Sequence, residues 1–366
     1  MKLLYLVPNI NNEGGVARVL SIKTWYLIEK WGYEIHIVTQ NKGNAPLFFN
    51  FHPAIAYHDI SLKGTGFSFL KAYKKEVNQL VLTLHPDHLI VCDNGVKAFL
   101  LPFLLSSKVS KLLEIHSSKY ISEHSFQYNL IIRVTHLVTV FVKTIGITKF
   151  DKVIVESNES IVEWRLKEGL VIPNPLGYAT TEFATLQSKL AMAVGRPNYE
   201  KGYDRMFAIW KKVVAKHPDW HLNVYANTDG PIDLEALALQ NEVQNHISFF
   251  KPILHIEEKY KEVSIYLMTS RYEGFGMVLI EAMESGVPCI AYDCPCGPRS
   301  IITNNQNGYL VPNDNEEGYV SKVCELIENQ SLRLELGKKA KESVSIYQIE
   351  SCMEQWNSLF ISLFSK

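Results

Sequence analysis

The sequence predicts an α/β protein made of two doubly wound units, each a parallel sheet with helices on both faces. Three observations lead to this fold class. The chain has 366 residues, more than one domain usually contains. Short apolar runs alternate with amphipathic segments of helical length, which is typical of strands buried on both faces of a parallel sheet. The alternation stops at 171–177, where two prolines and a glycine follow a strand end, and then starts again.

The first unit is expected over residues 1–172. Amphipathic segments such as 16–30 and 67–84 supply its helices. Its apolar runs predict six strands, at 3–7, 34–39, 54–60, 88–93, 111–116 and 152–156.

An inter-domain linker is expected over 173–188 and the second unit over 189–345. The remaining segment, 346–366, is amphipathic and predicts a helix that either packs back on the first unit or is a simple terminal helix. The strands of the second unit are predicted at 190–194, 221–226, 247–250, 265–269 and 287–292.

Composition and charge exclude several classes of protein. The formal net charge of -1 argues against a general nucleic-acid binder. Residues 1–150 are basic and the rest of the chain is acidic, so we expect the first unit to meet an anionic membrane surface or a phosphorylated acceptor, unless the charge is random surface charge. The apolar segment 130–147 carries charged residues that argue against a membrane span. Residues 120–149 predict either an interfacial helix or core packing.

The cysteines and the first residues indicate where the protein works. Six cysteines in a chain of this length do not form a disulfide framework, and Cys294 and Cys296 have the wrong spacing for a zinc site. No signal peptide is visible, because the apolar start is short and predicts a strand. We therefore expect a cytoplasmic protein without a bound metal.

The most informative segment is 273–281. Glu273 precedes two glycines, a helical apolar run follows, and Glu281 comes eight positions after Glu273. A glycine loop that opens a helix leaves backbone N–H groups free to bind an anion. The carboxylates on either side accept hydrogen bonds from hydroxyl groups. A phosphate with hydroxyls on both sides describes a nucleotide sugar.

Further candidate residues follow other predicted strands. Arg196 and Lys201 share one loop and can neutralise a diphosphate, although solvated surface charges are the alternative. Gly14 and Gly15 open the first helix and either approach a phosphate or form a plain turn. His116 ends a strand and is either catalytic or structural. Because ligands bind beyond the carboxyl ends of such strands, we expect the site in a cleft between the two units.

Five motifs occur in a fixed order: G-G-x-A-R, I-H-S, I-P-N-P, G-R-x4-K-G and E-G-F-G-x4-E. In this combination the chain resembles, over essentially its whole length, the family-4 retaining glycosyltransferases of the GT-B fold, which consists of two Rossmann-like domains facing across a cleft. The resemblance implies transfer of a hexose or N-acetylhexosamine from a nucleotide diphosphate sugar, expected to be UDP-linked, without metal or cofactor. The basic first unit and the segment 120–149 indicate a saccharide or lipid-linked acceptor in surface polysaccharide assembly, and a peripheral place on the inner face of the cell membrane.

The resemblance also implies roles for individual residues. His116, Arg196, Lys201 and Glu273 would be catalytic, with the two cations on the diphosphate. Glu281 would hold the ribose hydroxyls. The donor-binding set would comprise Gly14, Gly15, Arg196, Lys201, Lys251, Pro252, Glu273, Gly274, Phe275, Gly276, Met277, Val278 and Glu281.

Two other functions remain open from the sequence. A nucleotide-sugar 2-epimerase can share the two-domain architecture and would consume no acceptor. A non-catalytic nucleotide-sugar-binding subunit would keep the fold without turnover, although the intact carboxylates and cations argue against it. A nicotinamide dehydrogenase is disfavoured, because neither unit carries the glycine fingerprint with its acidic partner.

Overall fold

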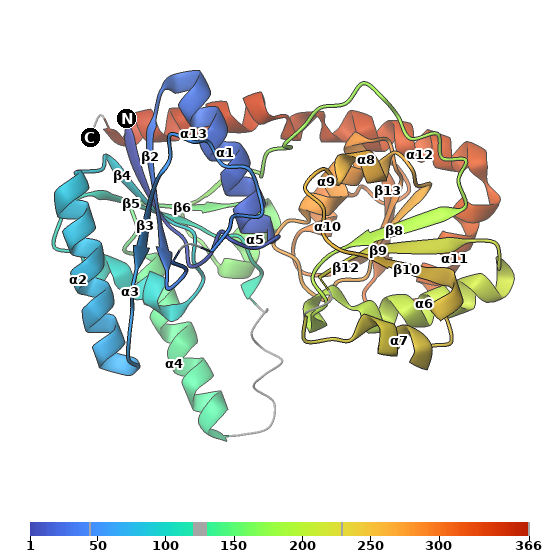
Figure 1. Cartoon of the computed structure of the whole chain (residues 1–366), viewed down its shortest axis with the longest axis horizontal. Helices are drawn as coiled ribbons and strands as arrows, with labels where there is room; N and C mark the ends of the chain where they lie inside the picture. The colour runs from blue at the N-terminus through green and yellow to red at the C-terminus, as the bar shows by residue number, and fades with distance from the viewer. Residues whose placement is uncertain (44, 120–129, 228–229, 365–366) are drawn as a thin grey trace. The chain divides into compact units, whose positions relative to one another are not determined.

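The computed structural model describes residues 1–43, 45–119, 130–227 and 230–364, without the side chains of 130–136. The chain divides into two compact units. The first combines Met1–Pro175 with Ile349–Lys366, and the second is Leu176–Gln348. Each unit is a parallel sheet covered by helices (Figure 1).

The first unit contains a seven-stranded sheet in the order β3-β2-β1-β4-β5-β6-β7. Its core is formed by apolar side chains of the strands and of the helices that cover them. The strands are β1 Lys2–Leu6, β2 Glu34–Gln40, β3 Ala56–Ile60, β4 His88–Val91, β5 Ser110–Glu114, β6 Lys152–Val155 and β7 Gly169–Val171. The helices are α1 Gly15–Trp31, α2 Gly66–Leu84, α3 Val96–Leu104, α4 Leu130–Ile147, α5 Asn158–Trp164 and α13 Ile349–Phe364.

Helix α13 belongs to the first unit although it follows the second in sequence. Trp356 and Phe360 are buried. The Phe360 ring stacks on His88 with 5.5 Å between the ring centroids, and its carbonyl lies 3.0 Å from the Nε2 atom of His88. The Tyr33 hydroxyl donates to the Asn357 side chain at 2.5 Å. The amphipathic pattern of the terminal segment is therefore used to cover the first unit.

The second unit contains a six-stranded parallel sheet in the order β10-β9-β8-β11-β12-β13. The strands are β8 Leu190–Val194, β9 His221–Tyr225, β10 Ile247–Phe250, β11 Ile265–Met268, β12 Cys289–Asp293 and β13 Gly308–Pro312. The α-helices are α6 Tyr203–Lys216, α7 Leu234–Gln240, α8 Glu257–Tyr260, α9 Met277–Glu284, α10 Pro298–Ile301, α11 Glu316–Glu328 and α12 Gln330–Ser343. Three 3-10 turns are η2 Tyr199–Lys201, η3 Gln244–His246 and η4 Val344–Tyr347.

The predicted α/β class with two doubly wound units is confirmed. Strand ends differ from expectation by a few residues, and β7 and β13 were not predicted as strands. Most of the segment expected as a linker, 176–188, is packed structure of the second unit. Leu176 N donates to Tyr347 O, Tyr178 Oη to Glu281 O, and Ala184 N to Ser285 O.

Strand order reverses once in each sheet. The reversal falls between β1 and β4 in the first unit and between β8 and β11 in the second. In open α/β sheets the crevice at this point, beyond the carboxyl ends of the strands, is where ligands bind. The loop with Gly14 and Gly15 follows β1, and the loops with Lys201 and Glu273 follow β8 and β11. The topology therefore brings the last two loops together.

Candidate functional site

Lys201 and Glu273 meet at the strand reversal of the second unit. The Lys201 ammonium donates to Glu273 Oε1 at 2.7 Å. Ser270 Oγ donates to the same oxygen at 2.6 Å. The Lys201 side chain is 23% exposed and that of Glu273 10%, so both groups keep some access to solvent. This contact joins a predicted cation of the G-R-x4-K-G motif to the predicted carboxylate of the E-G-F-G-x4-E motif.

The glycine loop beside this pair opens helix α9. Gly276 has a φ of 100° and is the N-cap of α9, which begins at Met277. A left-handed φ of this kind suits glycine. The first N–H groups of the helix face its N-terminal end, where an anion is favoured. Phe275 is buried, with its ring centroid 5.3 Å from that of Tyr347, so only its main chain is suited to contact a ligand.

A neighbouring segment holds the Glu273 backbone. Glu273 N donates to Pro295 O at 2.8 Å, and Cys296 N donates to Glu273 O at 2.9 Å. A Cβ atom on Gly297 would lie 2.0 Å from Phe275 O, so the two segments approach closely. The glutamate loop is therefore fixed from one side by residues 295–297, in the segment between β12 and α10.

The remaining predicted residues of the second unit have different surroundings. Glu281, on α9, is buried, and the Tyr260 hydroxyl donates to its Oε2 atom at 3.3 Å. Arg196 is exposed on the loop after β8. Lys251 and Pro252 follow β10, which is separated from β8 by β9. Their roles in donor binding stay predictions, as do those of Gly274 and Val278.

In the first unit the two predicted glycines lie at the start of α1. Gly14 is the N-cap and its N–H donates to the side chain of Asn12 at 3.0 Å. A Cβ atom on Gly14 would lie 2.8 Å from Asn12 Oδ1, whereas none on Gly15 would meet a neighbour within 4 Å. Gly15 therefore leaves open space at a helix N-terminus, as a ligand approaching the backbone would require.

His116 lies in a buried cluster of charged groups. Its Nδ1 atom is 2.9 Å from Glu156 Oε1, and its Nε2 atom is 3.2 Å from Glu114 Oε1. The Lys23 ammonium, from α1, lies 2.5 Å from Glu114 Oε1 and 3.5 Å from the centroid of the Trp356 ring. All of these charged side chains are at most 5% exposed. The His116 ring is thus fixed by two carboxylates.

The charges of the cluster set its protonation. Burial alone lowers the pKa of His116, but Glu114 and the hydrogen bonds around the ring raise it well above the usual value of 6.5. Burial alone raises the pKa of Glu114, but the charges of Lys23 and His116 bring it to about 2. Two cations therefore face two carboxylates in the folded protein.

The same cluster contains a group of side chains close enough to share an ion. Ligand atoms of Cys92, Glu114 and His116 all lie within 4.8 Å of one another. The chemistry does not fit a metal, because the fully buried Lys23 ammonium already occupies Glu114 and would repel a second cation. Burial, together with Glu114, also raises the pKa of the Cys92 thiol to about 11, which disfavours a thiolate ligand.

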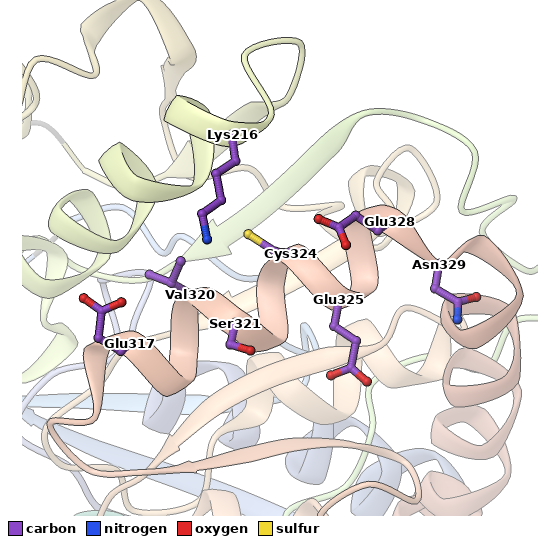
Figure 2. A pocket seen from close by; sticks show the side chains of 8 residues that line it. All are labelled: Lys216, Glu317, Val320, Ser321, Cys324, Glu325, Glu328 and Asn329. Atoms are coloured by element: carbon purple, nitrogen blue, oxygen red, sulfur yellow. The ribbon is translucent and has the colours of Figure 1, made fainter.

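A pocket of about 710 Å³ lies elsewhere on the second unit, against α6 and α11 (Figure 2). None of the predicted site residues lines it. Its lining consists of Lys216, Glu317, Val320, Ser321, Cys324, Glu325, Glu328 and Asn329. Exposed glutamates around one cysteine do not describe a nucleotide-sugar site.

Sequence reasoning missed several residues that hold the site together. Glu114 lies two residues before His116 in the strand predicted at 111–116, and Glu156 ends the strand predicted at 152–156, so pairing those strands would have placed both beside His116. Lys23 could have been found as a lysine on the buried face of a predicted helix. Ser270 and Arg271 directly precede the glutamate loop, but no local pattern assigns them a partner.

Comparison with known proteins finds similarity to glycosyltransferases. Residues 182–343 match the family model described as Glycosyl transferases group 1. This match lies within the second unit. The chain is 27% identical over 367 residues to an uncharacterized glycosyltransferase of Haemophilus influenzae, covering 98% of this chain and 99% of that protein. It is also 27% identical over 370 residues to the amylovoran biosynthesis glycosyltransferase AmsD of Erwinia amylovora, with the same coverage.

Solved structures confirm the GT-B fold. TarM of S. aureus, in a complex that contains UDP, superposes with a TM-score of 0.79 at 16% identity, covering 98% of this chain and 99% of that chain. Sucrose-phosphate synthase of Thermosynechococcus elongatus superposes with a TM-score of 0.81 at 17% identity, covering 100% of this chain and 99% of that chain. The family-model match and the two sequence relatives support a glycosyltransferase, and the solved structures show its GT-B fold.

Proposed function

We propose that this GT-B protein is a retaining, metal-independent glycosyltransferase of the family-4 type. It transfers a hexose or N-acetylhexosamine from a UDP-sugar to a saccharide or lipid-linked acceptor in surface polysaccharide synthesis. The observation that carries the proposal is the 2.7 Å contact between Lys201 and Glu273 beside the N-terminus of α9. It combines a cation and free backbone amides for a diphosphate with a carboxylate for sugar hydroxyls. AmsD, named for amylovoran biosynthesis, supports the polysaccharide setting.

The proposed mechanism uses these groups on the leaving diphosphate. As the glycosidic bond to the diphosphate breaks, negative charge builds on its oxygen atoms and positive charge on the sugar. Lys201, Arg196 and the amides at Phe275–Met277 stabilise the negative charge as it forms. The acceptor attacks from the same face and gives its proton to the departing phosphate, so the anomeric configuration is retained. The resemblance also assigns His116 to the donor sugar, but both of its ring nitrogens face carboxylates and its side chain is 4% exposed, so we give it no step in this mechanism.

A panel of nucleotide sugars tests the function. The protein is incubated, with and without EDTA, with UDP-glucose, UDP-galactose, UDP-GlcNAc or GDP-mannose. Nucleotide release and thermal stabilisation are measured for each sugar. We expect one UDP-sugar to raise the melting temperature, as mass action requires, and to release UDP regardless of EDTA. An epimer formed without acceptor would indicate the epimerase. Binding without turnover with every acceptor would indicate a binding subunit.

We also propose that the first unit meets an anionic membrane surface through α4. Residues 120–129 of the predicted interfacial segment lie outside the described part of the chain. On the described part of α4, Leu137, Val138, Phe141 and Ile145 are exposed and share one face of the helix. Figure 1 shows α4 extending away from the sheet of the first unit. Within the described residues, no helix has both the length and the apolar character needed to cross a membrane.

Vesicle partitioning tests this contact. We expect binding to anionic vesicles that salt weakens, and a several-fold loss of binding in Phe141→Ser, which removes one large apolar side chain from the interface. Leu239→Ser is the matched control, because Leu239 is equally exposed in the second unit. Equal binding to neutral and anionic vesicles at all salt concentrations would contradict the electrostatic part of the proposal.

A further inference from the structure

The loops that carry Lys201 and Glu273 touch through their backbones. Gly202, directly after Lys201, has a φ of 66°, and a Cβ atom there would lie 2.3 Å from Thr269 O. The Thr269 hydroxyl donates to Gly202 O at 2.9 Å. The position requires glycine for both its conformation and its space. The turn after β8 thus packs against the residue that follows β11.

Arg271 ties the same two loops together a second time. Its guanidinium donates to both carboxylate oxygens of Asp204, at 2.9 and 2.6 Å, and to Tyr199 O at 2.9 Å. It also lies over the Tyr199 ring, 4.1 Å from the centroid. The Arg271 backbone N–H donates to Glu200 O at 2.7 Å. Residues on both sides of Lys201 therefore bind one arginine that lies two positions before Glu273.

We propose that Arg271 and Asp204 form a clasp that positions the Lys201 ammonium against the Glu273 carboxylate. Neither residue is catalytic here, because they act through the two loops that they join. The inference rests on the proposed function of Lys201 and Glu273 and adds to it the residues that set their spacing. A planar fork with two parallel hydrogen bonds fixes direction as well as distance, which a lysine ammonium does not.

We expect the clasp to matter more for geometry than for stability. The Asp204 side chain is 47% exposed, so solvent screens its charge, although the Arg271 side chain is 11% exposed and the pair is bidentate. By contrast, a displacement of about 1 Å in a group that contacts the reacting atoms can cost about 100-fold in rate. Loss of function without loss of stability is therefore the signature that separates a positioning role from a structural one.

A double-mutant cycle tests the clasp. We compare the Kd of UDP and of GDP, donor turnover and Tm across a set of variants. The set is Arg271→Lys, Asp204→Asn, Lys201→Ala and the two double variants that add Lys201→Ala. We expect Arg271→Lys and Asp204→Asn each to weaken UDP binding about tenfold or more with Lys201 present, and less than about twofold in the Lys201→Ala background. Lys211→Gln is the control, because Lys211 lies on α6, as Asp204 does, and its ion pair with Glu242 is exposed. The clasp variants should lose activity out of proportion to any drop in Tm beyond that of this control.

The outcomes separate two failures. Suppose that Lys201→Ala weakens UDP binding and that the fold-losses in affinity from Arg271→Lys and Lys201→Ala multiply in the double variant. Arg271 then does not act through Lys201, and the clasp is wrong. If both clasp variants lose activity only in proportion to a Tm drop larger than that of Lys211→Gln, the role is structural and the clasp is again wrong. If Lys201→Ala itself changes neither UDP binding nor turnover, the proposed function of Lys201 has failed, and the clasp with it.

Discussion

Both units place charged residues near the carboxyl ends of strands, but the first unit buries its charges and the second leaves them accessible. In the first, Lys23 and His116 face Glu114 and Glu156, with every side chain at most 5% exposed. In the second, Lys201 keeps a quarter of its side chain exposed beside Glu273. Buried charges of this kind need partners inside the protein, whereas the accessible pair has room to accept one from a ligand. The same architecture thus supports a closed cluster, formed by Lys23, Glu114, His116 and Glu156, and an open pair, formed by Lys201 and Glu273.

The closed cluster should be the more sensitive to loss of a charge. We expect Lys23→Met to lower the free energy of unfolding by about 3–5 kcal/mol, because it leaves Glu114 buried with half its compensation. Urea unfolding measures it. Lys212→Met is the control, since Lys212 is exposed and its pairs with Glu316 and Glu317 lie in solvent, so its loss should matter little. Equal costs for the two variants would show that the cluster is not sealed.

The open pair should show its effect in turnover instead. We expect Lys201→Ala to slow donor turnover by about 100-fold or more, because one charge contact to the leaving diphosphate is lost in the transition state. Steady-state release of UDP measures it. Lys189→Ala is the control. Lys189 lies just before β8 and pairs with Asp219, so its loss should leave turnover unchanged. Near-normal turnover in Lys201→Ala would show that the accessible pair in the second unit does not act on the donor.

The smallest expected effect is the pH dependence of stability that the closed cluster produces. The folded protein holds the His116 proton more tightly than the unfolded chain does, since its pKa lies above 6.5. Its contribution to stability is therefore complete below about pH 6.5 and declines as the pH rises through the folded-state value. The free energy of unfolding of wild type minus that of His116→Gln should fall with rising pH, by at most about 1.4 kcal/mol per pH unit.

Urea titrations between pH 5 and 9 measure this difference, and titrating groups remote from the cluster cancel in the subtraction. For Glu114 the sign is opposite. Its pKa of about 2 in the folded protein means that its stabilisation is present above 4.5 and is lost as the pH falls from 4.5 towards 2. A wild-type-minus-variant difference that stays constant from pH 5 to 9 would contradict a protonated His116.

The sequence predicted the fold and part of the site, for reasons that individual residues make clear. The meeting of Lys201 with Glu273 followed from two motifs that each end a strand, once β8 and β11 are neighbours. The packing of 176–188 on the second unit depends on single hydrogen bonds, such as Tyr178 Oη to Glu281 O, which leave no periodic pattern. Strand β7 has three residues, too few for an alternation to be detected.

The cluster around His116 could be predicted only in part, for a different reason. Whether Lys23 is buried depends on Trp356, which lies in the last helix and covers it only in three dimensions. A lysine in an otherwise apolar helix face gives no sign of which ring or carboxylate it will meet. Residues that assemble a site from distant parts of the chain are therefore harder to predict than residues that share one loop.

The return of α13 to the first unit fixes an order of events during synthesis. Residues 1–175 leave the ribosome before Trp356 and Phe360 have been made, so the nascent unit lacks the rings that pack on Lys23 and His88. Residues 176–348 are all present before that cover arrives, and domains generally fold as units while the chain grows. The unit that emerges first is consequently the one completed last.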